Sequence, residues 1–444
     1  MARGVKGDGP ASRSFHVETL GCPKNAVDSD KVVASLLADG LVPAPAAEAA
    51  DLIVVNTCAF IEAAREESVE TALALADARK PGAQLVVTGC MAERYGDALA
   101  EALPEADAVV GFAGEGALAD VAVVRPPTGV RDLLELPRPA PSAPWAYLKT
   151  AEGCDRACAF CAIPSFRGKQ RSRPPAAIEA EAQALVGGGV TELVLVAQDL
   201  AWYGRDVGEP RALAPLLRRL DALAAEGLRR VRLLYLYPSE VRDPLVATML
   251  ELPTVVPYFD LSLQHADRAL LARMRRWGSG DRFLSILERI RADEPDAAFR
   301  SSFIVGFPGE TEDHHEALLG FLAAADLDWA GFFPFSREDG TAAAALDGEV
   351  PPPLMEERLR ECTDVQEPIT LARRDALVRT RAELDVLIDG PADEGDGVFG
   401  RTHREAPEID GVVRLPASSA DPGSIVRARA TGAEGLDVLA VPVS

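Results

Sequence analysis

The stretch GCDRACAFC, residues 153–161, places Cys154, Cys158 and Cys161 in a C-x3-C-x2-C pattern. Thiolates are the ordinary ligands of iron–sulfur clusters, and a cluster of four irons takes four ligands. Three cysteines close in sequence would therefore hold three irons and leave the fourth iron open, in the way that a catalytic zinc keeps one position free. The spacing predicts a 4Fe–4S cluster with an iron available for chemistry.

A structural zinc site and a redox-active thiol pair are the alternatives. A closed zinc site needs four ligands, and no fourth Cys or His lies near, since the next histidine is His265. A thiol pair would leave the third cysteine unexplained. The open cluster is favoured, and both alternatives remain.

The same motif, with AFCAIPSFRGKQRSRP at residues 159–174, resembles the radical S-adenosylmethionine (radical SAM) superfamily. The chain from about residue 15 to 444 is similar, in three blocks, to the methylthiotransferases. This resemblance implies that SAM binds the open iron of the cluster at Cys154, Cys158 and Cys161.

Bulk properties narrow the class of protein. A length of 444 residues suggests two or three domains, and no apolar run is long enough to span a membrane. Residues 1–14 lack the apolar segment of a secretory signal, and we expect them to form a mobile leader. Seven cysteines without a secretion signal indicate a cytoplasmic protein whose reduced thiols serve as ligands.

The formal net charge is −23. A nucleic-acid-binding surface needs Lys and Arg to displace counterions from phosphates, so the charge favours a basic protein partner instead. A local basic patch at Arg167, Lys169, Arg171 and Arg173 is one possible exception. The simplest alternative is that the charge only keeps the protein soluble.

The first block, residues 15–140, alternates strands at 15–20, 51–57, 84–89 and 107–112 with helices at 24–38, 60–79 and 91–102, which predicts a small parallel sheet. Cys22, Cys58 and Cys90 each follow a strand and precede a helix. Such positions share the carboxyl edge of a parallel sheet. We therefore expect a second three-cysteine site, although buried cysteines also occur for packing alone.

The motifs TLGCPKNAVDSD, NTCAF and TGCMAERY, which begin at Thr19, Asn56 and Thr88, resemble those of the methylthiotransferase N-terminal domain. The resemblance implies an auxiliary 4Fe–4S cluster at Cys22, Cys58 and Cys90. Asn25 and Asn56 flank the three cysteines, and they either shape the site or make turn hydrogen bonds.

The second block, residues 141–375, follows a proline-rich segment at 126–144. Strands expected at 145–150, 191–197, 230–236, 258–264, 299–305 and 330–335 alternate with helices, which predicts a partial (βα)6 barrel. By resemblance, AQD (197–199), LQHA (263–266) and FIVGFPGET (303–311) line the SAM and substrate pocket. The predicted cofactor-binding residues are Gln198, Gln264, Arg300 and Gly306, and no catalytic side chain is predicted beyond the cluster ligands.

The third block, residues 376–444, follows a helix at about 354–375. Five short strands predict a small all-β barrel that resembles the OB-like TRAM domain. From Leu377 onward there are 7 arginines, no lysine and 12 carboxylates, which disfavours direct RNA binding. GRTHREAPEIDGVV (400–413) resembles the TRAM motif of the branch that modifies a ribosomal protein.

The resemblance implies methylthiolation of the β-carbon of an aspartate in the small-subunit ribosomal protein S-twelve, with two SAM per turnover and sulfur delivered at the auxiliary cluster. That C–H bond is too weakly acidic for a side-chain base, so the reaction needs a radical from a cofactor. A tRNA adenosine methylthiotransferase and an iron–sulfur electron-transfer or assembly protein are the alternatives. We expect a monomer that draws electrons from an unidentified one-electron donor.

Overall fold

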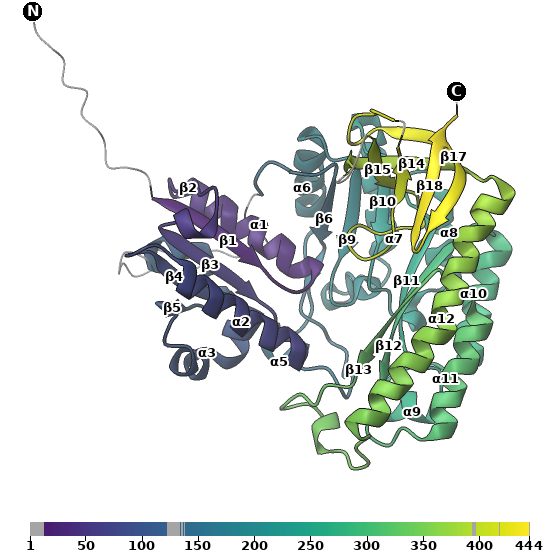
Figure 1. Ribbon diagram of the computed structural model, residues 1–444, viewed down its shortest axis with the longest axis horizontal. Coiled ribbons are helices and arrows are strands. Elements are labelled where there is room, and N and C mark those ends of the chain that lie inside the picture. Colours follow the sequence, from purple (N-terminus) through teal and green to yellow (C-terminus); the bar gives the residue numbers. More distant parts are fainter. Residues whose placement is uncertain are drawn as a thin grey trace, which may run out of the picture. The chain divides into compact units, whose positions relative to one another are not determined.

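The computed structural model describes residues 13–121, 134, 136, 138–392, 397–416 and 418–443 (Figure 1). Residues 1–12 of the predicted leader and most of the proline-rich segment lie outside these ranges. The chain divides into two compact units. Unit 1 runs to Pro139 and includes Ser165–Arg167, and unit 2 holds Ala140–Pro164 and Gly168–Ser444. The described part contains no helix that is long and apolar enough to cross a membrane.

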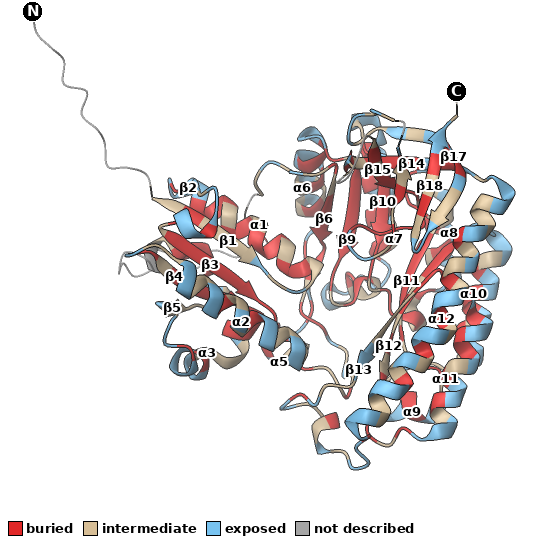
Figure 2. Ribbon diagram, in the orientation of Figure 1, coloured by how far each residue is buried: buried red, intermediate tan, exposed pale blue. Residues whose placement is uncertain are grey.

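Unit 1 contains the predicted parallel sheet. Its strands are β1 (Ser14–Thr19), β2 (Val42–Pro43), β3 (Leu52–Thr57), β4 (Gln84–Gly89) and β5 (Ala108–Val109), in the order β2-β1-β3-β4-β5. The helices are α1 (Pro23–Ala38), α2 (Glu62–Ala78), α3 (Cys90–Ala102) and α4 (Leu118–Val121), with 3-10 turns η1 (Ala47–Ala49) and η2 (Phe112–Ala117). Strand β3 is buried along its whole length (Figure 2), as a central strand covered on both faces must be.

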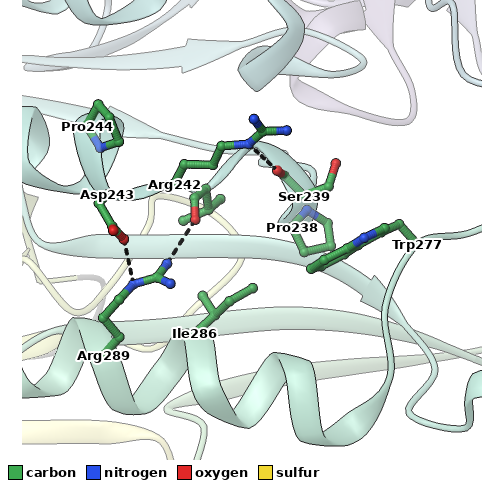
Figure 3. Close-up of a pocket in the computed structure, with 9 residues that line it drawn as sticks. Pro238, Ser239, Arg242, Asp243, Pro244, Trp277, Ile286 and Arg289 are labelled. Carbon is green, nitrogen blue, oxygen red and sulfur yellow. Dashed lines mark hydrogen bonds and ion pairs between the residues drawn. The ribbon is translucent and has the colours of Figure 1, made fainter.

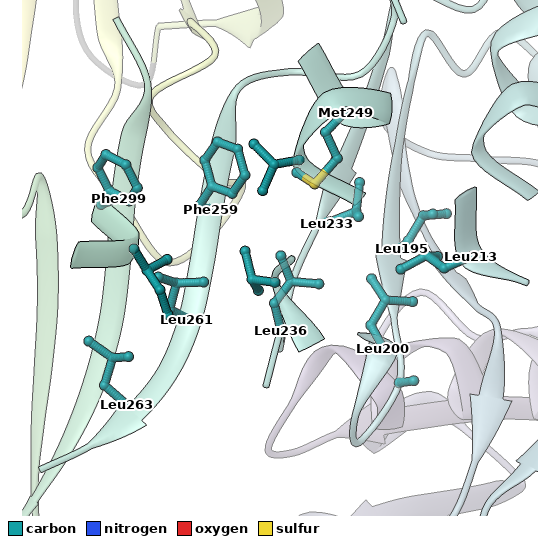
Figure 4. Close-up of a cluster of buried hydrophobic side chains, with 14 of the residues drawn as sticks. Leu195, Leu200, Leu213, Leu233, Leu236, Met249, Phe259, Leu261, Leu263 and Phe299 are labelled. Carbon is teal, nitrogen blue, oxygen red and sulfur yellow. The ribbon is translucent and has the colours of Figure 1, made fainter. Parts of the chain in front are cut away.

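Unit 2 begins with the predicted partial barrel. Strands β6 (Trp145–Lys149), β9 (Glu192–Val196) and β10 (Arg230–Leu233) form one parallel sheet, and β11 (Tyr258–Gln264), β12 (Ala298–Val305) and β13 (Trp329–Pro334) form another. Two parallel bridges, Val231–Val255 and Leu236–Leu261, join the two halves. Leucine, methionine and phenylalanine side chains from both halves pack into one core (Figure 4).

The helices of the barrel are α6 (Pro175–Gly187), α7 (Leu213–Asp221), α8 (Asp243–Glu251), α9 (Arg268–Arg273), α10 (Gly280–Asp293) and α11 (Glu312–Ala325). The short helix α5 (Ile163–Phe166) belongs in part to each unit. Short 3-10 turns η4 (Leu200–Trp202) and η7 (Pro238–Glu240) follow β9 and β10. The two-residue strands β7 (Ala151–Glu152) and β8 (Arg171–Ser172) pair antiparallel and close the base of the loop that carries Cys154, Cys158 and Cys161.

The long helix α12 (Pro352–Thr380) starts and ends beyond the predicted range. Its buried residues Arg358, Cys362, Gln366, Thr370 and Arg374 recur every fourth position, so they form one stripe along the helix. The stripe packs against α11 and β13 (Figure 1).

The chain ends in the predicted small barrel. Strands β14 (Glu383–Pro391), β15 (Val398–Arg401), β16 (Val413–Leu415), β17 (Ile425–Glu434) and β18 (Asp437–Pro442) close in the order β14-β15-β16-β18-β17. Four of the strand pairs in this barrel are antiparallel, whereas β16 and β18 run parallel.

The connection between β15 and β16 contains the GRTHREAPEIDG motif, and it packs within unit 2 against the amino ends of the partial-barrel strands. Arg230, the first residue of β10, donates to the Arg401 carbonyl oxygen at 2.6 Å. Tyr258, the first residue of β11, donates its hydroxyl to Asp410 at 2.6 Å. Trp329, the first residue of β13, donates to the Arg404 carbonyl oxygen at 2.6 Å. The motif is therefore an internal joint, which the sequence alone did not indicate.

Two three-cysteine sites as the candidate functional site

The loop with Cys154, Cys158 and Cys161 begins at Gly153, whose φ is +75°. A Cβ there would lie 2.2 Å from the carbonyl oxygen of Lys169, so the close return of the loop requires glycine. Two hydrogen bonds hold this return: the Cys154 N–H donates to the Gly168 carbonyl at 3.1 Å, and the Gln170 N–H donates to Asp155 at 3.1 Å.

Arg156 anchors the same loop to the carboxyl ends of β9 and β10. Its guanidinium lies between two aromatic rings, 3.9 Å from the centroid of Trp202 and 3.7 Å from that of Tyr237. It also donates to Asp199 at 2.7 Å. Cation–π contacts of this kind strengthen when they are shielded from water. The cysteine loop is thus fixed on the barrel by a residue between its first two cysteines.

The three thiols of this loop lie within electrostatic reach of one another. Burial, with contributions from the neighbouring thiols, raises the pKa of Cys154 to about 11 and that of Cys161 to about 12. The Arg276 guanidinium donates to Cys158 Sγ at 3.4 Å. Because a metal binds the thiolate, loading this site must release protons.

Unit 1 brings together the other three cysteines at the carboxyl edge of its sheet. Cys22 caps α1, Cys58 follows β3 directly, and Cys90 opens α3. Gly21 has a φ of +92°, and a Cβ there would lie 2.9 Å from Cys58 Sγ, so glycine is required beside the site.

The thiols of this second site have different proton affinities. Burial raises the pKa of Cys90 to about 12, and charge at Cys22 and Cys58 adds to it. Burial also acts on Cys22, but the cations of Lys24 and Arg167 outweigh it and lower the pKa of that thiol. Cys22 is therefore the thiol most ready to become a ligand.

Arg167 is the residue of unit 1 that contacts a cysteine sulfur most closely. Its Nε and Nη2 atoms lie 3.2 and 3.1 Å from Cys90 Sγ. Nη2 also donates to Asn25 Oδ1 at 2.6 Å, and an ion pair of 3.2 Å joins the guanidinium to Asp28. The predicted basic patch is wrong at this position, because Arg167 is buried; Arg173 is buried as well and pairs with Glu181.

Asn25 and Asn56 both make the backbone hydrogen bonds that one hypothesis expected. Asn25 donates to the carbonyl oxygens of Leu20 and Thr57, and Asn56 donates to that of Asn25. Asn25 also accepts from Arg167. Asn25 therefore both stabilises the turn and orients Arg167 beside Cys90.

Each site offers three free thiols, which are the ordinary ligands of iron–sulfur clusters. Among the described residues, no three His, Cys, Asp or Glu side chains stand close enough to hold one metal ion. Thiolates on one zinc lie about 3.8 Å apart, since each Zn–S bond is about 2.3 Å. In a cluster each thiolate binds a different iron, which spaces the sulfurs more widely. Three thiols at each place are the donor set that an iron–sulfur cluster with one open iron would take.

Three of the four predicted cofactor-binding residues lie at carboxyl ends of barrel strands. Gln198 follows β9 and donates to Glu152 at 3.0 Å. Gln264 ends β11 with a φ of +74°. Gly306 follows β12, and its N–H donates to Glu310 at 2.7 Å.

Arg300 lies apart from these three. It is the third residue of β12 and precedes Gly306 by six positions, about 20 Å along a strand. Its guanidinium pairs with Asp260 and Asp410, each at 3.4 Å. Its ion pair with Asp410 connects Arg300 to the joint with the C-terminal barrel.

Glu310 lies within the predicted pocket segment FIVGFPGET (303–311), but the sequence did not single it out. Its carboxylate accepts from the N–H groups of Gly306 and Phe307 and pairs with buried Arg358 of α12 at 3.0 Å. It thus holds the Gly-rich turn in place. The position could have been found from its place four residues after Gly306, where an acid can cap the turn.

A cavity of about 550 Å³ lies between η7, α8 and α10, beside Trp277 (Figure 3). Its cations already have partners: Arg289 pairs with Asp243 at 3.0 Å, and Arg242 donates to the Ser239 carbonyl at 3.0 Å. None of the predicted site residues lines it.

Known proteins match the chain along its length. Residues 14–111 match the Uncharacterized protein family UPF0004, residues 148–322 the Radical SAM superfamily, and residues 382–443 the TRAM domain. "Ribosomal protein uS12 methylthiotransferase RimO" of Kineococcus radiotolerans is 41% identical, covering 97% of this chain and 98% of that protein. The protein of the same name from Acidothermus cellulolyticus is 43% identical, covering 98% and 97%.

Among solved structures, the radical S-adenosylmethionine methyltransferase TsrM from Kitasatospora setae, with cobalamin and a [4Fe-4S] cluster bound, has a TM-score of 0.55 at 15% identity. The alignment covers 75% of this chain and 77% of TsrM. At that identity the likeness supports the fold.

Proposed function

The chain belongs to the RimO family of ribosomal protein uS12 methylthiotransferases, and we propose that it attaches a methylthio group to the β-carbon of an aspartate in uS12, the small-subunit protein S-twelve. One observation carries the proposal: each unit gathers three buried or half-buried cysteines, at the carboxyl edge of the sheet in unit 1 and in the loop after the first barrel strands in unit 2. The chemistry needs two such sites, one for SAM and one for sulfur.

We assign Cys154, Cys158 and Cys161 to the cluster that binds SAM, and Cys22, Cys58 and Cys90 to the auxiliary cluster. When bound, these cofactors supply the radical chemistry and the sulfur that an unactivated C–H bond requires. Gln198, Gln264 and Gly306 are proposed to line the SAM pocket, since all three sit where a barrel places its catalytic groups. Arg300 is assigned to the barrel joint.

The chain's own residues prepare the site. Arg156 holds the cysteine loop against Trp202 and Tyr237, so the three thiols stand ready before the cluster is loaded. Burial of Cys154 excludes water from the place where a radical must survive. Glu310 fixes the backbone of the Gly-rich turn that would face SAM.

Charge supports a basic protein as the substrate. The net charge of −23 would steer a basic ribosomal protein toward the enzyme. The exposed acids Glu383 and Asp385 of β14 are already paired with Arg427, and the GRTHREAPEIDG segment is largely buried. The attraction would therefore come from the net charge of the whole chain and not from this buried motif. We propose that the protein works as a cytoplasmic monomer and that its TRAM barrel does not bind RNA.

The test uses purified protein reconstituted anaerobically with iron and sulfide, then given SAM and dithionite with either uS12 or total tRNA. Mass spectrometry should find one methylthio group on one aspartate of uS12 and none on tRNA. Cys158→Ala protein is the control and should form neither product. Methylthiolated tRNA adenosine with unmodified uS12 would establish the tRNA alternative. If neither substrate changes and no methionine is released from SAM, an electron-transfer or assembly role replaces the proposal.

A further inference from the structure

We propose that Arg167 sets the reduction potential of the auxiliary cluster by donating two N–H groups to the sulfur of Cys90. The inference rests on the proposed cluster at Cys22, Cys58 and Cys90. It assigns a positioning and tuning role to a residue that the family resemblance did not single out.

The geometry is that of a fork on a single sulfur. Nε and Nη2 lie on one edge of the planar guanidinium, and both reach Cys90 Sγ, at 3.2 and 3.1 Å. Contacts to sulfur are normally longer than those to oxygen, so these two are close. By contrast, Arg276 reaches Cys158 Sγ through one nitrogen, at 3.4 Å. The two cysteine sites therefore differ in the strength of their arginine donor.

The guanidinium is held on all sides, so it cannot swing away from the sulfur. Asp28 faces Nη1 and Nη2 at 3.2 Å, and both side chains of this pair are 3% exposed. Asn25 Oδ1 accepts from Nη2 at 2.6 Å. The ring of Phe112 lies 4.8 Å from the guanidinium carbon. Three elements, α1, the start of α3 and η2, thus converge on one side chain.

Reduction by one electron adds one negative charge to the iron and sulfur atoms of a cluster and breaks no bond. Hydrogen bonds to the sulfurs and nearby positive charge stabilise that added charge and raise the potential. The effect is largest where water cannot screen it. Arg167 supplies both terms in a buried place, so the auxiliary cluster should be reduced more easily than it would be without this arginine.

A purely structural role is the competing explanation, since Arg167 also joins Ser165–Arg167 to the rest of unit 1. Lysine separates the two roles. Arg167→Lys keeps a cation opposite Asp28 but lacks the rigid fork that contacts one sulfur twice. Arg167→Gln removes the charge as well. Arg79→Gln is the matched control, because it removes the same charge from unit 1 at an ion pair with Asp107, near the amino end of β4.

The experiment uses the full chain with Cys154, Cys158 and Cys161 replaced by alanine, so that only the auxiliary cluster is loaded. Iron and sulfide are counted, and the potential is titrated anaerobically by electron paramagnetic resonance. In Arg167→Gln we expect the equilibrium constant for reduction to fall at least tenfold, or about 59 mV for one electron, with altered g values. Arg167→Lys should shift the same way by less, and Arg79→Gln should not shift.

Each outcome bears on a separate claim. If protein with Arg167 binds no cluster at Cys22, Cys58 and Cys90, the proposed function and this inference both fail. If the cluster loads and neither Arg167 variant changes its potential or g values, only the role of the arginine is overturned. Should Arg167→Gln fail to load iron, the lysine variant decides, and an unshifted potential in that variant overturns the inference.

Discussion

Replacing Glu192 with glutamine should weaken the joint between the TRAM barrel and the partial barrel. Glu192 opens β9 and is fully buried. It pairs with Arg232 at 2.7 Å and with Arg401, at the end of β15, at 2.8 Å. Both arginines are themselves buried. The variant would leave the Arg232 guanidinium without its carboxylate partner in a place that water does not reach, whereas Arg401 would keep its ion pair with Asp389 at 2.7 Å.

The loss of folding free energy in this variant follows from the burial of the ion pair and from the pKa of Glu192. Removing one member of a buried ion pair costs about 3–5 kcal/mol. Burial alone would raise the pKa of Glu192, but Arg401 and Arg232 outweigh it and lower that pKa to about 2. Against an ordinary value near 4.3, this corresponds to about 3 kcal/mol of folding free energy. Because the pKa is lowered in the folded state, this stability is present above about pH 4.3 and is lost as the pH falls toward 2.

Calorimetry of the full chain measures the effect. At about 2 °C per kcal/mol for a protein of this size, Glu192→Gln should lower the Tm of the transition of unit 2 by about 6–10 °C at pH 7. The difference from the unsubstituted protein should shrink below pH 4. The control is Glu251→Gln, which breaks an exposed pair with Arg218 and should change little. Equal Tm values for the two variants would refute the idea that this buried network holds the two barrels together.

Three further predictions concern the cysteines, their loop and the substrate. Replacing Cys22, Cys58 and Cys90 with alanine should halve the iron per chain, as should replacing the other three, whereas Cys362→Ala should keep all of it; equal iron in all variants would contradict the assignment. Arg156→Ala should weaken iron retention at the cysteine loop about 30-fold against a chelator, since the two cation–π contacts of Arg156 are worth about 2 kcal/mol together. Arg218→Ala is the control, and equal iron retention in the two variants would show that Arg156 does not hold the loop. The affinity for uS12 should fall steeply between about 50 and 300 mM salt, because salt screens the surface charges that attract the substrate. An affinity that does not change with salt would rule out steering by charge.

The sequence predicted the parts of the fold that depend on local pattern. The apolar run at 52–55 became the buried strand β3, and cysteines placed after strands met at a sheet edge because parallel strands end together. The five strands of the C-terminal barrel were also predicted. In these places the hydrophobic period and the turn residues mark each strand locally, before any strand has paired.

What could not be predicted depends on contacts distant in sequence. Nothing in GRTHREAPEIDG shows that Arg232 donates to the carbonyl of His403, because such a bond exists only after both barrels fold. Arg167 looked like part of a basic surface, and its burial follows from Asp28, which is 139 positions away. Strand β2 is two exposed residues long and includes a proline, so no hydrophobic pattern in the sequence predicted a strand there.

Mass spectrometry of cells with and without the gene tests most directly whether this chain methylthiolates uS12. Intact uS12 and digested tRNA nucleosides should be measured from the same cultures, with the gene and with its Cys158→Ala form returned as controls. We expect uS12 alone to lose one methylthio group without the gene and to regain it only with the unsubstituted form. Loss of a methylthio group from tRNA with uS12 unchanged would contradict uS12 as the substrate.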